Sequence, residues 1–179
     1  MFSLDNLISD CKAAVAGGRS AQAEVREILA RAVADPDAVV RELGEPEKGG
    51  VGKLYDSEDL TIINVIWGPY MTIMPHNHEM WANIGIYGGR EDNIFWRRVP
   101  DAEDGYIEAA GAESLGLSDA TTLGRDIIHS VTNPLSKLTG AIHIYGGDFF
   151  RVDRSEWDPE SHRERAYDME KNLRILADA

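Results

Sequence analysis

The stretch PHNHEMWANIGIYGG, residues 75–89, combines the signals from which the fold of this chain can be predicted. It opens with two histidines one residue apart, continues into the β-rich run 81–87 and ends in a Gly-Gly turn. In a strand, side chains at positions i and i+2 point to the same face, about 6–7 Å apart along the strand. His76 and His78 are therefore expected to face the same ligand.

Similar short runs lie on both sides of this stretch, and glycine- or proline-containing turns separate them. They cover residues 60–67, 71–74, 93–99, 127–131, 139–145 and 149–152. Many short strands with such turns are typical of an antiparallel sandwich or barrel. We expect a mainly β fold, with a barrel over residues 50–154.

Helices are expected at both ends of the chain, within one domain spanning 1–179. Residues 1–47 contain apolar residues at helical spacing, with Ser3, Ser20 and Asp35-Pro36 as start signals for three helices. Cys11 lies on the first apolar stripe and is expected in the core. The charged tail 159–179 has apolar residues at intervals, which predicts a C-terminal helix against the barrel.

Composition excludes several classes of protein. The 179 residues carry a formal net charge of −13 without a block of Lys or Arg, which disfavours a nucleic-acid partner. No apolar run is long enough to cross a bilayer, and the N-terminus lacks the basic region of a signal peptide. A single cysteine, Cys11, allows no intrachain disulfide. We expect a cytoplasmic protein without a membrane partner.

A third histidine completes a candidate metal site. His129 lies in another β-type run, DIIHSV over 126–131, so its imidazole can meet those of His76 and His78 from a second strand. Glu79 directly follows His78 and would face away in a continuing strand. Whether Glu79 takes part in the site is left open.

These motifs resemble the cupin superfamily. Residues 76–89 are similar to its first motif, and His129 with Asn133 four residues later is similar to its second. Where the family usually has a glutamate ligand, this chain has Ala82 and Asn83. A three-histidine set without a carboxylate resembles the cysteine dioxygenase-like thiol dioxygenases.

Two further elements support this branch, and the likeness covers about residues 54–147. Trp67-Gly68 precedes the first motif as in that branch, and AIHIY over 141–145 is similar to its Ser-x-His-x-Tyr element. Ala141 replaces the serine, and the segment 50–55 lacks the arginine that binds a substrate carboxylate in cysteine dioxygenases.

The resemblance implies a double-stranded β-helix that holds Fe(II) on His76, His78 and His129, with Zn or Ni as other options. It also implies a small thiol and O2 as reactants, and catalytic roles for Tyr145 and His143. Trp81, close to the HxH pair, and Arg97, on a predicted strand, are our candidates for substrate binding.

Two other functions stay open at this point. Imidazole ligands suit several metals, so a metallocupin isomerase, lyase or hydrolase with Zn, Mn or Ni is an alternative. A non-catalytic small-molecule-binding cupin is the other. Exposed sheet edges are often buried by pairing, so a homodimer is also an expectation.

Overall fold

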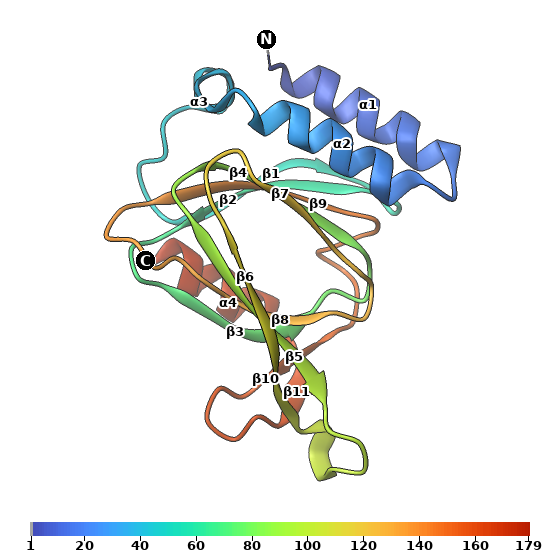
Figure 1. The fold of residues 1–179 in the computed structure, drawn as a ribbon, viewed down its shortest axis with the longest axis vertical. Helices are drawn as coiled ribbons and strands as arrows, with labels where there is room; N and C mark the ends of the chain where they lie inside the picture. Colours follow the sequence, from blue (N-terminus) through green and yellow to red (C-terminus); the bar gives the residue numbers. More distant parts are fainter. Residues whose placement is uncertain (1) are drawn as a thin grey trace.

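Two antiparallel sheets face each other and form a barrel in the computed structural model, which describes residues 2–179 (Figure 1). One sheet has the order β1 (Gly50–Asp56), β2 (Thr61–Trp67), β9 (Thr139–Tyr145), β4 (Ala82–Gly88) and β7 (Ala120–Leu123). The other has the order β11 (Glu164–Ala166), β10 (Ser155–Trp157), β3 (Thr72–Asn77), β8 (Ile128–Thr132), β5 (Glu91–Arg98) and β6 (Ile107–Leu115). The predicted fold class, a double-stranded β-helix with helices at both ends, is confirmed.

The N-terminal helices cover the outer face of the five-stranded sheet (Figure 1). They are α1 (Leu4–Gly17), α2 (Ala21–Val33) and α3 (Pro36–Leu43), close to the predicted bounds. The side chains of Ser3 and Asp35 accept backbone hydrogen bonds as N-caps, whereas Ser20 makes no such cap and bonds Glu24 instead. The start signals were therefore correct in position, and at Ser20 wrong in mechanism.

Two local predictions are wrong. Residues 149–152 form a turn instead of a strand, because Arg151 and Val152 both donate backbone hydrogen bonds to the Asp148 carbonyl. The C-terminal helix, expected over 159–179, is the shorter α4 (Met169–Ala177), and the short strands β10 and β11 precede it. The side chain of Asp168 caps α4 and fixes where the helix begins.

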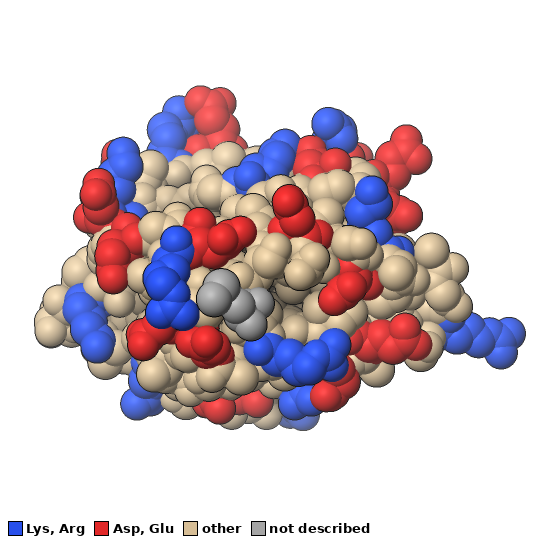
Figure 2. All heavy atoms as spheres, turned by 90° about the horizontal axis from the view of Figure 1, so that it is seen from above, with Lys and Arg blue, Asp and Glu red and all other residues tan. Residues whose placement is uncertain are grey.

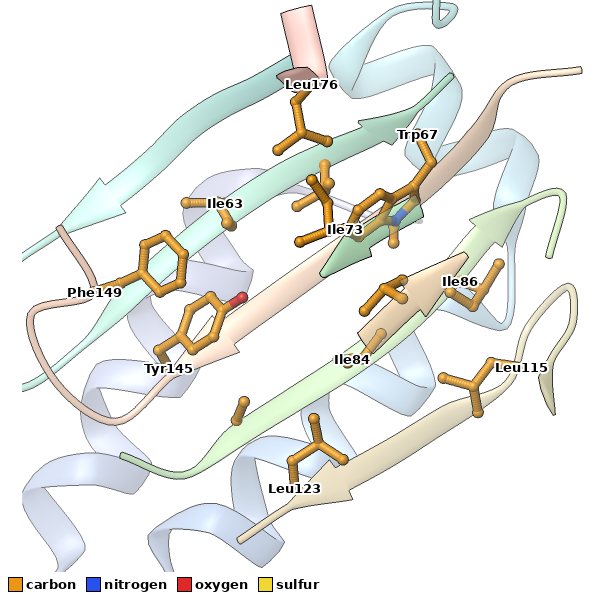
Figure 3. Packing of buried hydrophobic residues seen from close by; sticks show 14 of the residues in the cluster. Ile63, Trp67, Ile73, Ile84, Ile86, Leu115, Leu123, Tyr145, Phe149 and Leu176 are labelled. Atoms are coloured by element: carbon orange, nitrogen blue, oxygen red, sulfur yellow. The ribbon is translucent and has the colours of Figure 1, made fainter. Parts of the chain in front are cut away.

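Apolar residues pack in two layers, one inside the barrel and one between the sheet and the helices. Figure 3 shows the inner layer, in which Ile63, Ile84 and Tyr145 face the barrel interior. Cys11 is fully buried in the outer layer, as predicted. Strand β9 separates the two layers and is buried at every position, since both of its faces are covered.

The helix-covered face shows acidic and basic side chains interspersed, without a large area of one sign (Figure 2). In residues 2–179, no helix combines the length and the apolar character needed to span a bilayer.

Candidate metal centre

The three histidines predicted as metal ligands lie together inside the barrel. His76 is on β3 and is paired with His129 on β8, and His78 follows directly after β3. The three ring centroids are 4.7–5.1 Å apart, and one nitrogen from each ring lies within 4.8 Å of the other two. All three side chains are buried. This geometry allows the three imidazoles to bind one metal ion.

Hydrogen bonds place the proton of two of these rings on the nitrogen that points away from the cluster. Nδ1 of His76 lies 2.9 Å from the Met74 carbonyl oxygen, and Nδ1 of His129 lies 2.6 Å from Oδ1 of Asn93. Both partners are acceptors, so each Nδ1 donates and each Nε2 keeps its lone pair. A carbonyl or amide oxygen behind a histidine is the usual partner of a metal-binding imidazole.

The cluster is also electrostatically suited to a cation. Burial lowers the pKa of His76 to about 4 and the pKa values of His78 and His129 well below their ordinary range, so the rings are neutral at pH 7. Nε2 of His129 and Nε2 of His78 lie only 3.2 Å apart. Two nitrogens that approach this closely need a shared proton or a cation between them, and a divalent metal meets that need for all three rings.

Glu79 does not join this cluster. In the described part of the chain, the group of potential metal ligands at this place consists of the three histidines alone. The Glu79 carboxylate accepts a hydrogen bond of 2.7 Å from the Asn77 amide, and the residue has a positive φ of 56°. The left-handed backbone turns the chain after His78 and separates Glu79 from the strand.

Tyr145 and His143, the predicted catalytic residues, lie beside the histidine cluster. The Tyr145 ring is 5.0 Å from the His78 ring, and its hydroxyl is 3.1 Å from Nδ1 of His143. Figure 3 shows the Tyr145 ring against Phe149. Burial raises the pKa of Tyr145, so this side chain is a neutral phenol that can donate a hydrogen bond.

The cluster faces a cavity of about 40 Å³, which has room for a few atoms of a small molecule. Helix α4 and Tyr167 close it on one side, and strands of both sheets form the remaining wall. The lining is apolar except for a few polar side chains, chiefly His76, His78, His129, His143, Tyr145, Tyr167 and Asn172.

An arginine that the sequence reading missed lies against two residues of the cavity wall, Phe149 and Tyr167, and is not itself part of that wall. Arg154 is only 7% exposed, and its guanidinium lies 4.0 Å from the Phe149 ring and 4.1 Å from the Tyr167 ring. Its Nε, Nη1 and Nη2 atoms are buried and have no partner at hydrogen-bond distance among residues 2–179, although the neighbouring Tyr167 hydroxyl helps to stabilise its charge. Its charge contributes to the lowered pKa values of the three clustered histidines, which places it within electrostatic reach of them.

The two residues predicted to bind substrate lie elsewhere. Arg97 is on the part of β5 that extends beyond its pairing with β8, where its exposed side chain forms an ion pair with Glu108. Trp81 packs against Gly146 and the outer apolar layer and does not line the cavity. Neither placement supports a contact with a substrate in this cavity.

Two buried polar residues on β5 are further features that sequence reasoning missed. Glu91 and Asn93 are 0% and 1% exposed, whereas Ile94 is 41% exposed. Polar residues at the inward positions and an apolar residue at an outward one reverse the usual alternation of a half-buried strand. That reversal, readable in the sequence EDNI, was the available signal for a functional strand.

Comparisons with known proteins give relatives in fold only. No protein-family model matches the chain. No curated protein matches it either. Solved structures do: an RmlC-like cupin of Methanocaldococcus jannaschii has a TM-score of 0.48 and 10% identity, over 59% of this chain and 85% of that one.

Two more solved structures show the same kind of likeness. A mutant oxalate decarboxylase of Bacillus subtilis has a TM-score of 0.45 and 17% identity, over 60% of this chain but only 28% of that one. An uncharacterised protein of Klebsiella pneumoniae with a double-stranded β-helix domain has a TM-score of 0.43 and 9% identity, over 69% and 90%. These similarities concern the fold alone, and the buried histidine cluster of this chain could hold a metal.

Proposed function

We propose that this chain is a metal-dependent cupin dioxygenase that holds Fe(II) on His76, His78 and His129 and oxidises a small thiol bearing a carboxylate. The observation that carries the proposal is the set of three neutral imidazoles, without a carboxylate ligand, beside a tyrosine hydroxyl and an unpaired buried arginine. When bound, iron would supply redox chemistry and sites for thiolate and O2.

Arg154 supports an anionic substrate. A buried guanidinium without a hydrogen-bond partner is energetically costly, and a carboxylate can accept two parallel hydrogen bonds from it. Cation–π contacts with the rings of Phe149 and Tyr167 hold the guanidinium in place. Arg154 therefore fills the role for which the segment 50–55 offers no arginine.

Tyr145 and His143 would act on the bound substrate. Tyr145 lines the cavity with its neutral hydroxyl, whose oxygen can accept a hydrogen bond from a substrate atom there while its proton is donated to His143. Nδ1 of His143, 3.1 Å away, fixes the position of that hydroxyl. The small, mostly apolar cavity limits the substrate to a few heavy atoms.

The overall reaction balances without another reactant. A thiol, RSH, and O2 give a sulfinic acid, RSO2H: both oxygen atoms bind to sulfur, the S–H and O–O bonds break, and sulfur loses the four electrons that O2 gains. Arg154 would orient the carboxylate end of the thiol so that its sulfur lies at the histidine cluster.

Oxygen consumption tests this function directly. Metal-free protein is loaded with Fe(II) under argon and mixed with O2 and either carboxylate thiols (mercaptoacetate, 3-mercaptopropionate, cysteine) or carboxylate-free thiols (2-mercaptoethanol, cysteamine). We expect one O2 consumed per thiol, a sulfinate product by mass spectrometry, and higher kcat/KM for the carboxylate thiols.

Two controls complete the experiment. Protein loaded with Zn(II), which has no redox chemistry, and the variant His129→Ala should both consume no O2. If the iron-loaded protein consumes no O2 with any of these thiols, thiol dioxygenase activity is rejected. Equal rates with both groups of thiols would reject the role of Arg154 alone.

A further inference from the structure

Glu91 is a fully buried carboxylate that touches none of the three clustered histidines and yet connects to two parts of the site. Its Oε2 accepts hydrogen bonds from Nε1 of Trp67 at 2.9 Å and from Nε2 of His143 at 3.2 Å. Its Oε1 accepts one from the Asn93 amide at 3.1 Å. All three partners therefore point a donor at one carboxylate.

The first connection runs through Asn93 to His129. Because Glu91 accepts from the Asn93 amide, the Asn93 side chain turns its NH2 group toward Glu91 and its oxygen toward His129. That oxygen accepts from Nδ1 of His129, so Nε2 of His129 keeps its lone pair for the cluster. Glu91 thus determines which His129 nitrogen is free, although it lies two hydrogen bonds away.

The second connection runs through His143 to Tyr145. Glu91 accepts from Nε2 of His143, which places a proton on Nε2, and in the uncharged tautomer Nδ1 is then the acceptor. The Tyr145 hydroxyl, 3.1 Å from Nδ1, then donates to it. One carboxylate thereby fixes the hydrogen-bond direction at the metal cluster and at the tyrosine.

We propose that Glu91 is the positioning residue of this site, and that it sets the tautomers of His129, through Asn93, and of His143 by direct contact. Ala141 has no hydroxyl and therefore provides no side-chain partner for His143. The buried carboxylate of Glu91 supplies that partner instead. The connection to His129 needs only that the cluster binds a metal, whereas the connection to Tyr145 has a catalytic consequence only if the proposed function holds.

Glutamine at position 91 would reverse one connection. Since the indole N–H of Trp67 can only donate, the glutamine oxygen must face Trp67, and its NH2 group must face Asn93. Asn93 then turns over and presents its own NH2 to Nδ1 of His129. The His129 proton then favours Nε2, the nitrogen that faces the cluster, and must leave it before a metal binds there.

The tautomers can be measured in the wild-type protein without any variant. Long-range ¹H–¹⁵N correlation spectra of the metal-free protein at pH 7.5 distinguish protonated from unprotonated imidazole nitrogens. We expect His129 protonated at Nδ1 but not at Nε2, and His143 protonated at Nε2. An unprotonated Nε2 on His143, or a protonated Nε2 on His129, would overturn the proposal.

Zinc affinity tests the longer connection, with Zn(II) as the probe in competition with a chromophoric chelator. We expect Glu91→Gln to weaken zinc binding about 10- to 100-fold, the usual effect of losing a partner behind a metal ligand. Asn93→Ala should have a similar effect, and Glu91→Gln should add less than about threefold in the Asn93→Ala background because the connection is already broken. Additive effects would show that Glu91 does not act through Asn93.

A buried hydrogen bond away from the cluster separates positioning from simple stability. Tyr87 is 2% exposed, lies in the outer apolar layer and donates a hydrogen bond of 2.8 Å to Asn64. Tyr87→Phe should lower the melting temperature and leave zinc affinity within about threefold of wild type. If it weakens zinc binding as much as Glu91→Gln does, the role of Glu91 is only structural.

Neither the spectra nor the zinc titration requires turnover. Expected tautomers and zinc affinities without O2 uptake would reject the dioxygenase proposal and leave the positioning role of Glu91 at His129. O2 uptake with the opposite tautomers would do the reverse.

Discussion

Replacing Arg154 with methionine should make the protein more stable and less active. The guanidinium has no hydrogen-bond partner among residues 2–179, and burial lowers its pKa, which reports the cost of keeping the charge there. Methionine has similar length and can keep the contacts with the rings of Phe149 and Tyr167. The substitution therefore removes the buried charge while most of the packing remains.

The size of the effect follows from two opposing contributions. Burying one unpaired ion costs several kcal/mol, and stacking on two aromatic rings returns about 1–2 kcal/mol for each ring. We expect Arg154→Met to raise the free energy of unfolding by about 1–3 kcal/mol. For a chain of this length, that corresponds to a rise in melting temperature of about 3–10 °C.

The activity should change in the opposite direction. Loss of a charge-assisted contact to a carboxylate costs about 2–4 kcal/mol, which is a fall in kcat/KM of roughly 30- to 1,000-fold. The fall should appear with carboxylate thiols and be absent with cysteamine.

Urea unfolding, calorimetry and O2 uptake measure both effects. Arg151→Met is the matched control: Arg151 is 71% exposed and paired with Asp148, so its loss should change stability by less than about 0.5 kcal/mol. A destabilised Arg154→Met variant with unchanged kcat/KM would refute the reasoning, because Arg154 would then be a structural residue.

Other predictions concern the packing and the buried thiol. Gly85→Ala places a Cβ 2.8 Å from Leu29 and should cost about 1–3 kcal/mol in urea unfolding, whereas Gly52→Ala, whose nearest contact is 3.7 Å, should cost much less. Leu176→Ala should cost about 2–5 kcal/mol, measured the same way, because the side chain is buried between α4 and the barrel. Burial raises the pKa of Cys11 from 9.0 to about 12, so the unfolded state releases this proton first and stability falls between pH 9 and 12. Cys11→Ala should show a smaller fall in unfolding free energy over that range, and equal falls would contradict the burial argument.

The sequence was sufficient for the parts of the site that depend on local periodicity. His76 and His78 share a strand face at spacing i, i+2, and that spacing survives although the β3–β8 register shifts between Ile73 and His76. The helix starts at Ser3 and Asp35 were predictable for the same reason, because each side chain accepts a hydrogen bond from a backbone N–H three residues later.

The rest depends on contacts between distant segments. Arg154 follows a turn and is buried against the rings of Phe149 and Tyr167, which no periodicity signals. Arg97 lies an even number of residues from the inward-facing Glu91 and Asn93, so alternation predicts that it also faces inward. At Arg97, however, β5 is no longer paired with β8 and pairs only with β6. The alternation of side chains along a strand predicts which face each residue lies on. It does not predict where a strand leaves the barrel wall.

Helix α4 gives this small cavity a consequence for kinetics. Tyr167, Met169 and Leu176 cover the histidine cluster, and Glu156 ties the start of the helix to the strand beside His76. The size of the side chains on this helix therefore affects how readily a molecule reaches the cluster. Larger residues at positions 169 or 176 should lower the association rate of a substrate and leave the histidine cluster itself unchanged.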